Sequence, residues 1–139
     1  MTSDSPCFID TNLFIRYLTN DDPQKAEAVE KLLLNAKSGK IKLVTSHLVI
    51  AELVWVLASH YDQPNSTISD LLGAILNTEG LNVENGEIIE NALDIFDEEK
   101  IDFVDAYIIS FMRSRNMTRL YSYNKKHLSK FKDIQRLEP

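Results

Sequence analysis

The chain has 139 residues, a net charge of -6, 44% hydrophobic residues and 26% charged residues. These values are ordinary for a globular protein and exclude a collagen-like, low-complexity or largely disordered chain. No apolar run is long enough to span a membrane, and residues 1–5 lack the basic and apolar segments of an export signal, so we expect a cytoplasmic protein with no membrane partner. The single cysteine, Cys7, excludes an internal disulfide. The length suits one compact domain, and we predict a single domain over residues 1–139.

Apolar periodicity and turn residues divide the chain into short strands that alternate with helices. The predicted strands cover residues 6–9, 42–45, 80–83, 120–122 and 134–137. The predicted helices cover residues 13–18, 23–37, 46–61, 67–76, 86–96 and 102–112. This alternation predicts the α/β class, as a three-layer α/β/α sandwich around a short, mainly parallel sheet. We expect Cys7 to be buried in the first strand and Leu48, Trp55 and Tyr61 to lie in the core, with a dimer surface as the alternative for these last three.

Acidic and amide side chains occur where these elements meet. Asp10 ends the first strand, Glu52 lies in an otherwise apolar helix, Asp105 lies one turn into another helix, and Asn124 follows the fourth strand. Because ligands bind beyond the carboxyl ends of parallel strands, we expect these side chains to converge. For Asp10 the alternative is simple helix capping. For Asp102, three residues before Asp105 at the start of the same helix, capping is the favoured interpretation and metal binding the alternative.

Converging carboxylates need a cation. Two unit charges about 4 Å apart repel by about 4 kcal/mol at an effective dielectric constant near 20. Oxygen ligands favour a hard ion, so we expect Mg²⁺, or Mn²⁺, rather than zinc. Such an ion could bind a phosphodiester, deprotonate a water molecule and stabilise the departing oxygen. The acids therefore indicate metal-dependent cleavage of phosphodiester bonds.

The basic residues are concentrated near the carboxyl end of the chain. Residues 113–136 contain eight basic residues and one acid, a charge of +7, whereas the remainder carries -13. A basic segment on an acidic body can hold phosphates near a carboxylate site. We expect contacts with nucleic-acid phosphates from Arg113, Lys125, Lys126 and His127; the alternative is a solvated surface without a partner.

Four segments together carry a family resemblance: Phe-Ile-Asp-Thr-Asn at 8–12, Ser-His-Leu-Val-Ile-Ala-Glu-Leu at 46–53, Asp-Phe-Val-Asp-Ala-Tyr at 102–107 and Leu-Tyr-Ser-Tyr-Asn-Lys-Lys at 120–126. Because these segments occur in this order, the chain resembles PIN-domain ribonucleases of the VapC toxin type over nearly its whole length. The resemblance implies Mg²⁺-dependent RNA cleavage, a homodimer, and a small antitoxin protein that occludes the site. It also implies that Asp10, Glu52 and Asp105 are the metal-binding catalytic acids, with Thr11 and Asn12 as the polar pair beside the first.

The chain departs from that resemblance at one position. The family usually has aspartate after the fourth strand, where this chain has Asn124. An amide oxygen can accept a water or bind a cation weakly, but it carries no charge and cannot act as a base. We therefore count Asn124 and Asp102 as additional candidate ligands, with Ser122 as a supporting polar group.

Two other function classes remain open. A PIN-like fold could bind RNA or a protein partner without cleaving anything. An aspartate-based phosphotransferase could use Asp10 as its nucleophile, although that chemistry requires a second acid two residues later, where this chain has Asn12. The sequence has no Gly-x-Ser-x-Gly turn and no phosphate-cradling glycine loop, which disfavours serine hydrolases and nucleoside-triphosphate enzymes.

Overall fold

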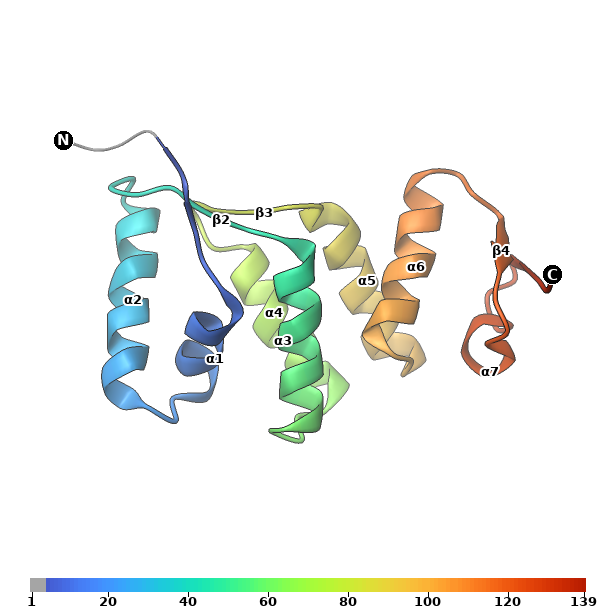
Figure 1. The fold of residues 1–139 in the computed structure, drawn as a ribbon, viewed down its shortest axis with the longest axis horizontal. Helices are drawn as coiled ribbons and strands as arrows, with labels where there is room; N and C mark the ends of the chain where they lie inside the picture. The colour runs from blue at the N-terminus through green and yellow to red at the C-terminus, as the bar shows by residue number, and fades with distance from the viewer. Residues whose placement is uncertain (1–4) are drawn as a thin grey trace. The chain divides into compact units, whose positions relative to one another are not determined.

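The computed structural model describes residues 5–139, and the chain divides into two compact units, Met1–Gly86 and Glu87–Pro139. Seven helices account for 59% of the described residues, and every strand pair among these residues is parallel (Figure 1). The predicted α/β class with a short parallel sheet is confirmed, in keeping with the three-layer α/β/α type.

The first unit alternates strands with helices. Its elements are β1 (Cys7–Phe8), α1 (Thr11–Thr19), α2 (Pro23–Lys37), β2 (Leu43–Thr45), α3 (His47–Ser59), α4 (Asn65–Leu76) and β3 (Leu81–Val83). The strands form a parallel sheet in the order β1-β2-β3. Cys7 aligns with Leu43, and Leu43 aligns with Leu81. Since the strands are parallel, the segments that leave β1 and β2 start at the same edge of the sheet.

Side-chain hydrogen bonds direct the chain as it leaves β1 and β2. The buried Thr45 hydroxyl donates to the carbonyl of Ile9 across 2.9 Å, which holds the end of β1 against the end of β2. Asp10 and Ser46 then cap α1 and α3. Asp22 caps α2, whose first residue, Pro23, needs no amide partner. Caps at these positions explain why helices begin directly beyond the strands.

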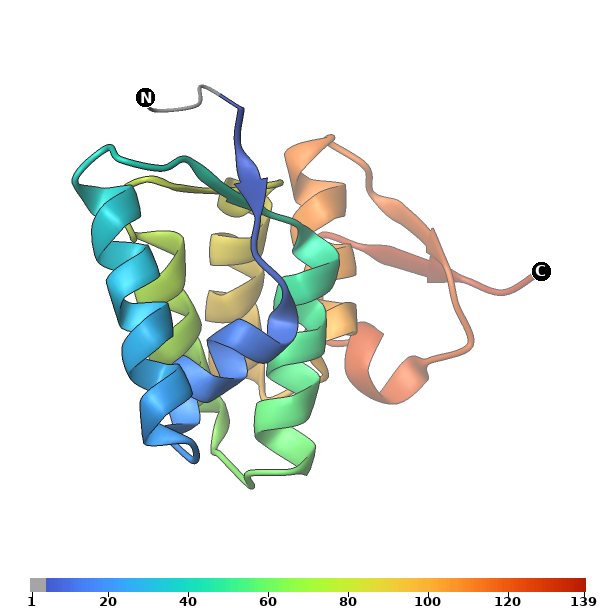
Figure 2. The ribbon, with the colours of Figure 1, turned by 60° about the vertical axis from the view of Figure 1, so that its left-hand side comes forward.

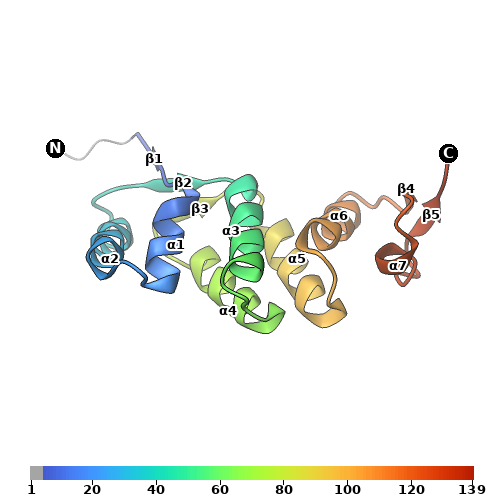
Figure 3. The ribbon, with the colours of Figure 1, turned by 60° about the horizontal axis from the view of Figure 1, so that its bottom comes forward.

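The helices of the first unit pack on one another. Helix α1 contacts both α2 and α3, and α3 contacts α4; Figures 2 and 3 show α1 beside α3. Their inward faces are buried and apolar, with Phe14, Ile50, Leu53 and Leu72 fully enclosed. Burial of each such side chain is worth about 1.5–3 kcal/mol. This core fixes the positions of α1 and α3, which carry the acids of the first unit.

The second unit contains α5 (Gly86–Glu99), α6 (Phe103–Ser114), β4 (Arg119–Tyr121), α7 (Lys125–Leu128) and β5 (Gln135–Leu137). Strands β4 and β5 pair in parallel, with Leu120 opposite Arg136. The buried Ser110 hydroxyl donates to the carbonyl of Ile88 across 2.7 Å, which ties α6 to α5. The rings of Phe96 and Phe103 meet edge to face, adding aromatic packing between the same helices.

Three predicted core residues are exposed, and those predictions were wrong. Cys7 lies in β1, an edge strand of two residues, and both Cys7 and Phe8 are exposed. Leu48 and Trp55 are 71% and 62% exposed because the buried face of α3 is formed by Val49, Ile50, Leu53, Val54 and Leu57. The sequence pattern also missed α7, whose four residues are too few to show a helical period.

Candidate functional site

Asp10 lies at the entry to α1, beyond the end of β1. Its Oδ1 accepts a hydrogen bond from the Thr11 backbone N–H across 2.7 Å. The capping alternative for Asp10 is therefore observed. A capping carboxylate keeps free lone pairs, so this bond is compatible with a second ligand. Of the two polar residues that follow, Thr11 is buried and Asn12 is exposed to solvent.

Glu52 lies on the exposed face of α3. It shares this face with Leu48 and Trp55, since residues four and seven apart in a helix point in similar directions. The carboxylate is therefore solvated, and the surrounding apolar sequence does not bury it. A solvated carboxylate is available to a ligand at little desolvation cost.

Asp10 and Glu52 line one pocket in the first unit. Its volume is about 280 Å³, and its lining consists of Asp10, Thr11, Asn12, Ile15, Arg16, Glu52, Val56 and Tyr61. Arg16 and Tyr61 both bind Asp21, the guanidinium at 3.1 Å and the hydroxyl at 2.9 Å. The hydrogen bonds from Tyr61 and Arg16 lower the pKa of Asp21 below its ordinary value. The pocket thus contains the carboxylates of Asp10 and Glu52. It also contains the Arg16 guanidinium, which already pairs with Asp21. The sequence patterns gave no reason to select Arg16 or Tyr61.

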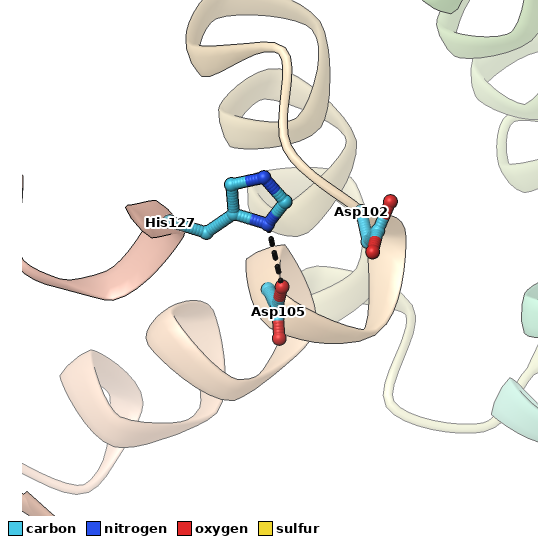
Figure 4. A group of neighbouring side chains, drawn as sticks. All are labelled: Asp102, Asp105 and His127. Carbon is cyan, nitrogen blue, oxygen red and sulfur yellow. Dashed lines mark hydrogen bonds and ion pairs between the residues drawn. The ribbon is translucent and has the colours of Figure 1, made fainter. Parts of the chain in front are cut away.

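The second unit holds a compact group of metal-ligating side chains. One ligand atom from each of Asp102, Asp105 and His127 lies within 4.8 Å of the others (Figure 4). Nδ1 of His127 lies 3.2 Å from Oδ2 of Asp105, and both side chains are partly buried. Asp102 occupies the N-cap position of α6, but its side chain makes no capping hydrogen bond within the described helix. Its carboxylate is exposed, and the capping role favoured from the sequence is not observed.

Asn124 connects this group to α7. Its Oδ1 accepts the backbone N–H of His127 at 3.2 Å, and its Nδ2 donates to Oδ2 of Asp105 at 3.1 Å. The orientation of the amide follows from these contacts, because a backbone N–H can only donate and an ionised carboxylate can only accept. Ser122 supports the turn by accepting the backbone N–H of Asn124 on its hydroxyl at 3.0 Å. Asn124 therefore directs its donor, and not its oxygen, at Asp105.

The residues predicted to contact RNA have different surroundings. Arg113 forms a paired contact with Asp133, with Nε and Nη2 donating at 2.8 and 3.0 Å. The Arg113 guanidinium lowers the pKa of Asp133 below its ordinary value. Lys125 Nζ lies 4.0 Å from a carboxylate oxygen of Glu138, and Lys126 is exposed. Two tyrosines on the same segment, Tyr121 and Tyr123, are also exposed.

Each unit thus gathers part of the predicted site. Asp10 and Glu52 line one pocket in the first unit, whereas Asp102, Asp105 and Asn124 form one cluster in the second. Sequence reasoning assigned His127 to RNA contact and missed its place beside Asp105. The motif Asn-Lys-Lys-His places the histidine one helical turn from Asn124, but it carries no signal for a contact with Asp105.

The donor set of the second unit suits a divalent cation. Carboxylate oxygens and imidazole nitrogens are common protein ligands of such ions. Two acids close together also lose mutual repulsion when a cation binds between them. The group Asp102, Asp105 and His127 could therefore hold a metal ion.

A parallel α/β fold carrying acidic groups of this kind is the architecture of a nuclease-type domain. The model of the PIN domain family matches residues 7–135, a span that includes residues of both units, and the chain belongs to this family. PIN domains are generally nucleases and typically use divalent metals. No match to a curated protein was found. Within the described residues, no helix is both long and apolar enough to cross a membrane.

Proposed function

We propose that the protein is a metal-dependent endoribonuclease. The observation that carries this proposal is the group of Asp102, Asp105 and His127 in a chain of the PIN family. The family supplies the reaction class, and the group supplies side chains suited to the ion that the reaction needs. We further propose that residues 1–139 act as one domain, which is supported by the family match spanning residues of both units.

We assign the metal-binding and catalytic roles to Asp10, Glu52 and Asp105, with Asp102 as an additional ligand. A divalent ion, Mg²⁺ or Mn²⁺, would offset the negative charge of the phosphodiester and lower the pKa of a bound water molecule. Asp10 and Glu52 are available for this role because both are exposed and line the same pocket. The carboxylate of Asp105 is the more enclosed, with a side-chain exposure of 17%.

Other side chains are assigned to support and to substrate contact. We assign support to Thr11, whose backbone N–H binds Asp10, and to Ser122, whose hydroxyl accepts the backbone N–H of Asn124. Asn12 lines the pocket of the first unit. We assign phosphate contacts to Lys125 and Lys126, which carry the charge that RNA backbones bind. Arg113 is a weaker candidate than sequence alone indicated, because Asp133 already pairs with it.

The substrate we propose is RNA with unpaired bases. Single-stranded loops expose bases that can stack on aromatic side chains, and the exposed Tyr121 and Tyr123 lie next to the basic residues. The resemblance to VapC toxins adds three finer proposals: the protein is the toxin of a toxin-antitoxin pair, a small antitoxin covers its site, and it forms a homodimer. We propose that it acts in the cytoplasm on cellular RNA.

The test is cleavage of an end-labelled, single-stranded RNA with Mg²⁺ or Mn²⁺, with and without chelator. We expect cleavage that stops on chelation. Asp105→Asn and Glu52→Gln should each lower the rate at least about 100-fold, because metal charge stabilisation is worth several kcal/mol. Glu27→Gln, a change to an exposed acid on α2, is the matched control and should cleave normally. Cleavage that persists in chelator would refute the proposal.

A second function is favoured by one observation. Asn124 is uncharged and donates to Asp105, so it adds no carboxylate to the cluster. A protein with this reduced charge could bind RNA without cutting it. RNA binding without cleavage in either metal, by protein free of any co-purified inhibitor, would support this alternative.

A further inference from the structure

The cluster of the second unit mixes two kinds of donor atom. Asp102 and Asp105 offer carboxylate oxygens, and His127 offers an imidazole nitrogen. Mg²⁺ strongly prefers oxygen and retains water in place of nitrogen ligands. First-row transition ions accept imidazole more readily than Mg²⁺ does, and the affinity of such a site rises from Mn²⁺ along the series. The nitrogen is therefore the atom in this cluster that can distinguish between metals.

Asn124 does not compete for that role. Its oxygen faces the His127 backbone N–H, and its amino group, not its oxygen, faces Asp105. An amino group has no lone pair available for a cation. The position of Asn124 instead fixes two ligands at once, since one amide group holds the carboxylate of Asp105 and the backbone that carries His127. Asn124 is thus a positioning residue.

The spacing of Asp105 and His127 suits a shared ion. Neighbouring ligands of an octahedral ion with bonds of about 2.1 Å lie about 3 Å apart. Nδ1 of His127 and Oδ2 of Asp105 lie 3.2 Å apart. This distance is therefore compatible with one ion that binds both atoms in place of the hydrogen bond, once the imidazole turns so that its Nδ1 lone pair faces the ion. Figure 4 shows both groups directed at the same space, with Asp102 beside them.

We propose that His127 is a direct metal ligand through Nδ1 and that it biases the site toward Mn²⁺ over Mg²⁺, with Asn124 positioning the imidazole and the carboxylate. This inference rests on the proposed metal dependence and goes further, because it names the ligand that selects the ion. It also gives His127 a role distinct from phosphate contact.

The first test is pulsed electron paramagnetic resonance of Mn²⁺ bound to the intact protein. A directly bound imidazole nitrogen produces a ¹⁴N modulation of the electron spin echo. We expect this modulation in the unaltered protein and its loss in His127→Gln. The matched control is His60→Gln, which removes an exposed histidine at the end of α3 and should leave the modulation unchanged. Bound Mn²⁺ without ¹⁴N modulation in the unaltered protein would overturn the inference.

The second test is calorimetric titration with Mn²⁺ and Mg²⁺ separately. His127→Gln should weaken Mn²⁺ binding at least about tenfold and change Mg²⁺ binding much less. Equal losses for both ions would overturn the selectivity. The failure of the broader proposal has a different signature: if Asp105→Asn binds Mn²⁺ as tightly as the unaltered protein, the cluster is not the metal site and both proposals fail.

Discussion

Asn124 donates a hydrogen bond from Nδ2 to Oδ2 of Asp105 across 3.1 Å, and the same oxygen faces Nδ1 of His127 at 3.2 Å. Two groups with donor capacity therefore meet one carboxylate oxygen. An aspartate at position 124 would replace the amide donor with a second negative charge at this distance. Compared with an aspartate, the Asn124 amide thus stabilises the Asp105 carboxylate when no cation is bound, but it offers a cation one negative charge fewer.

Asn124→Asp should make the stability of the protein depend on metal. Without metal, the loss of a hydrogen bond to a charged group and the new repulsion should lower the unfolding free energy by about 2–3 kcal/mol. Added Mn²⁺ should restore much of this loss because the cation offsets the new charge. Denaturant unfolding with chelator and with Mn²⁺ measures both effects. Equal stability of the variant and the unaltered protein in chelator would contradict the assigned hydrogen bond.

Gly80 should be intolerant of a side chain. Its φ is +84°, and a Cβ at this position would collide with the carbonyl group of Ala36. Gly80→Ala combines left-handed backbone strain of about 1–2 kcal/mol with overpacking of about 1–3 kcal/mol, so we expect a clear loss of thermal stability. Gly73→Ala is the matched control, because nothing lies near its Cβ within helix α4. That change should raise stability by about 0.5–1 kcal/mol.

Local signals in the sequence were sufficient to predict most elements of the fold. Helix α2 begins at Pro23 and ends at Lys37, as predicted, because a capping aspartate and a proline mark its start and its apolar period is regular. The strands were found from short apolar runs, yet nothing in those runs showed that β4 and β5 pair separately from β1, β2 and β3. Strand pairing depends on contacts between distant residues, which a local pattern does not encode.

The candidate site, like the fold, could be predicted from local signals only in part. Residue type and position made Asp10, Glu52 and Asp105 candidates, because an acid within an apolar stretch of sequence is unusual. The contacts that define the cluster connect Asp105 to Asn124 and His127, which lie 19 and 22 residues further along the chain. Which atom of Asn124 faces Asp105 depends on the backbone of α7, and sequence spacing alone could not supply that orientation.

Low pH should weaken the ion pair between Arg113 and Asp133. The pKa of Asp133 is lowered in the folded protein by the Arg113 guanidinium, so its deprotonated form favours folding. This contribution is present above the ordinary pKa of about 3.9 and is lost as the pH falls through the lower folded value. Asp133→Asn should therefore reduce stability at pH 7 by less than about 1 kcal/mol, as for other exposed pairs, and the difference should vanish near pH 2.

Denaturant unfolding across this pH range measures the effect of Asp133→Asn. Asp94→Asn, a change to an exposed acid on α5, serves as the control for loss of one negative charge. A difference that grows on acidification would contradict the sign of the pKa shift.

Lys126 should contribute to RNA binding through charge alone. It is exposed on α7, next to His127, and a lysine ammonium binds phosphate as a point charge. In an Asp105→Asn background, in which we expect cleavage to be at least about 100-fold slower, Lys126→Ala should weaken binding to single-stranded RNA equally for different sequences. The slope of log affinity against log salt should fall by about 0.7 for the lost phosphate contact. Lys31→Ala, on α2, should leave affinity and slope unchanged, and an equal effect of the two lysine changes would show that the basic segment has no specific role.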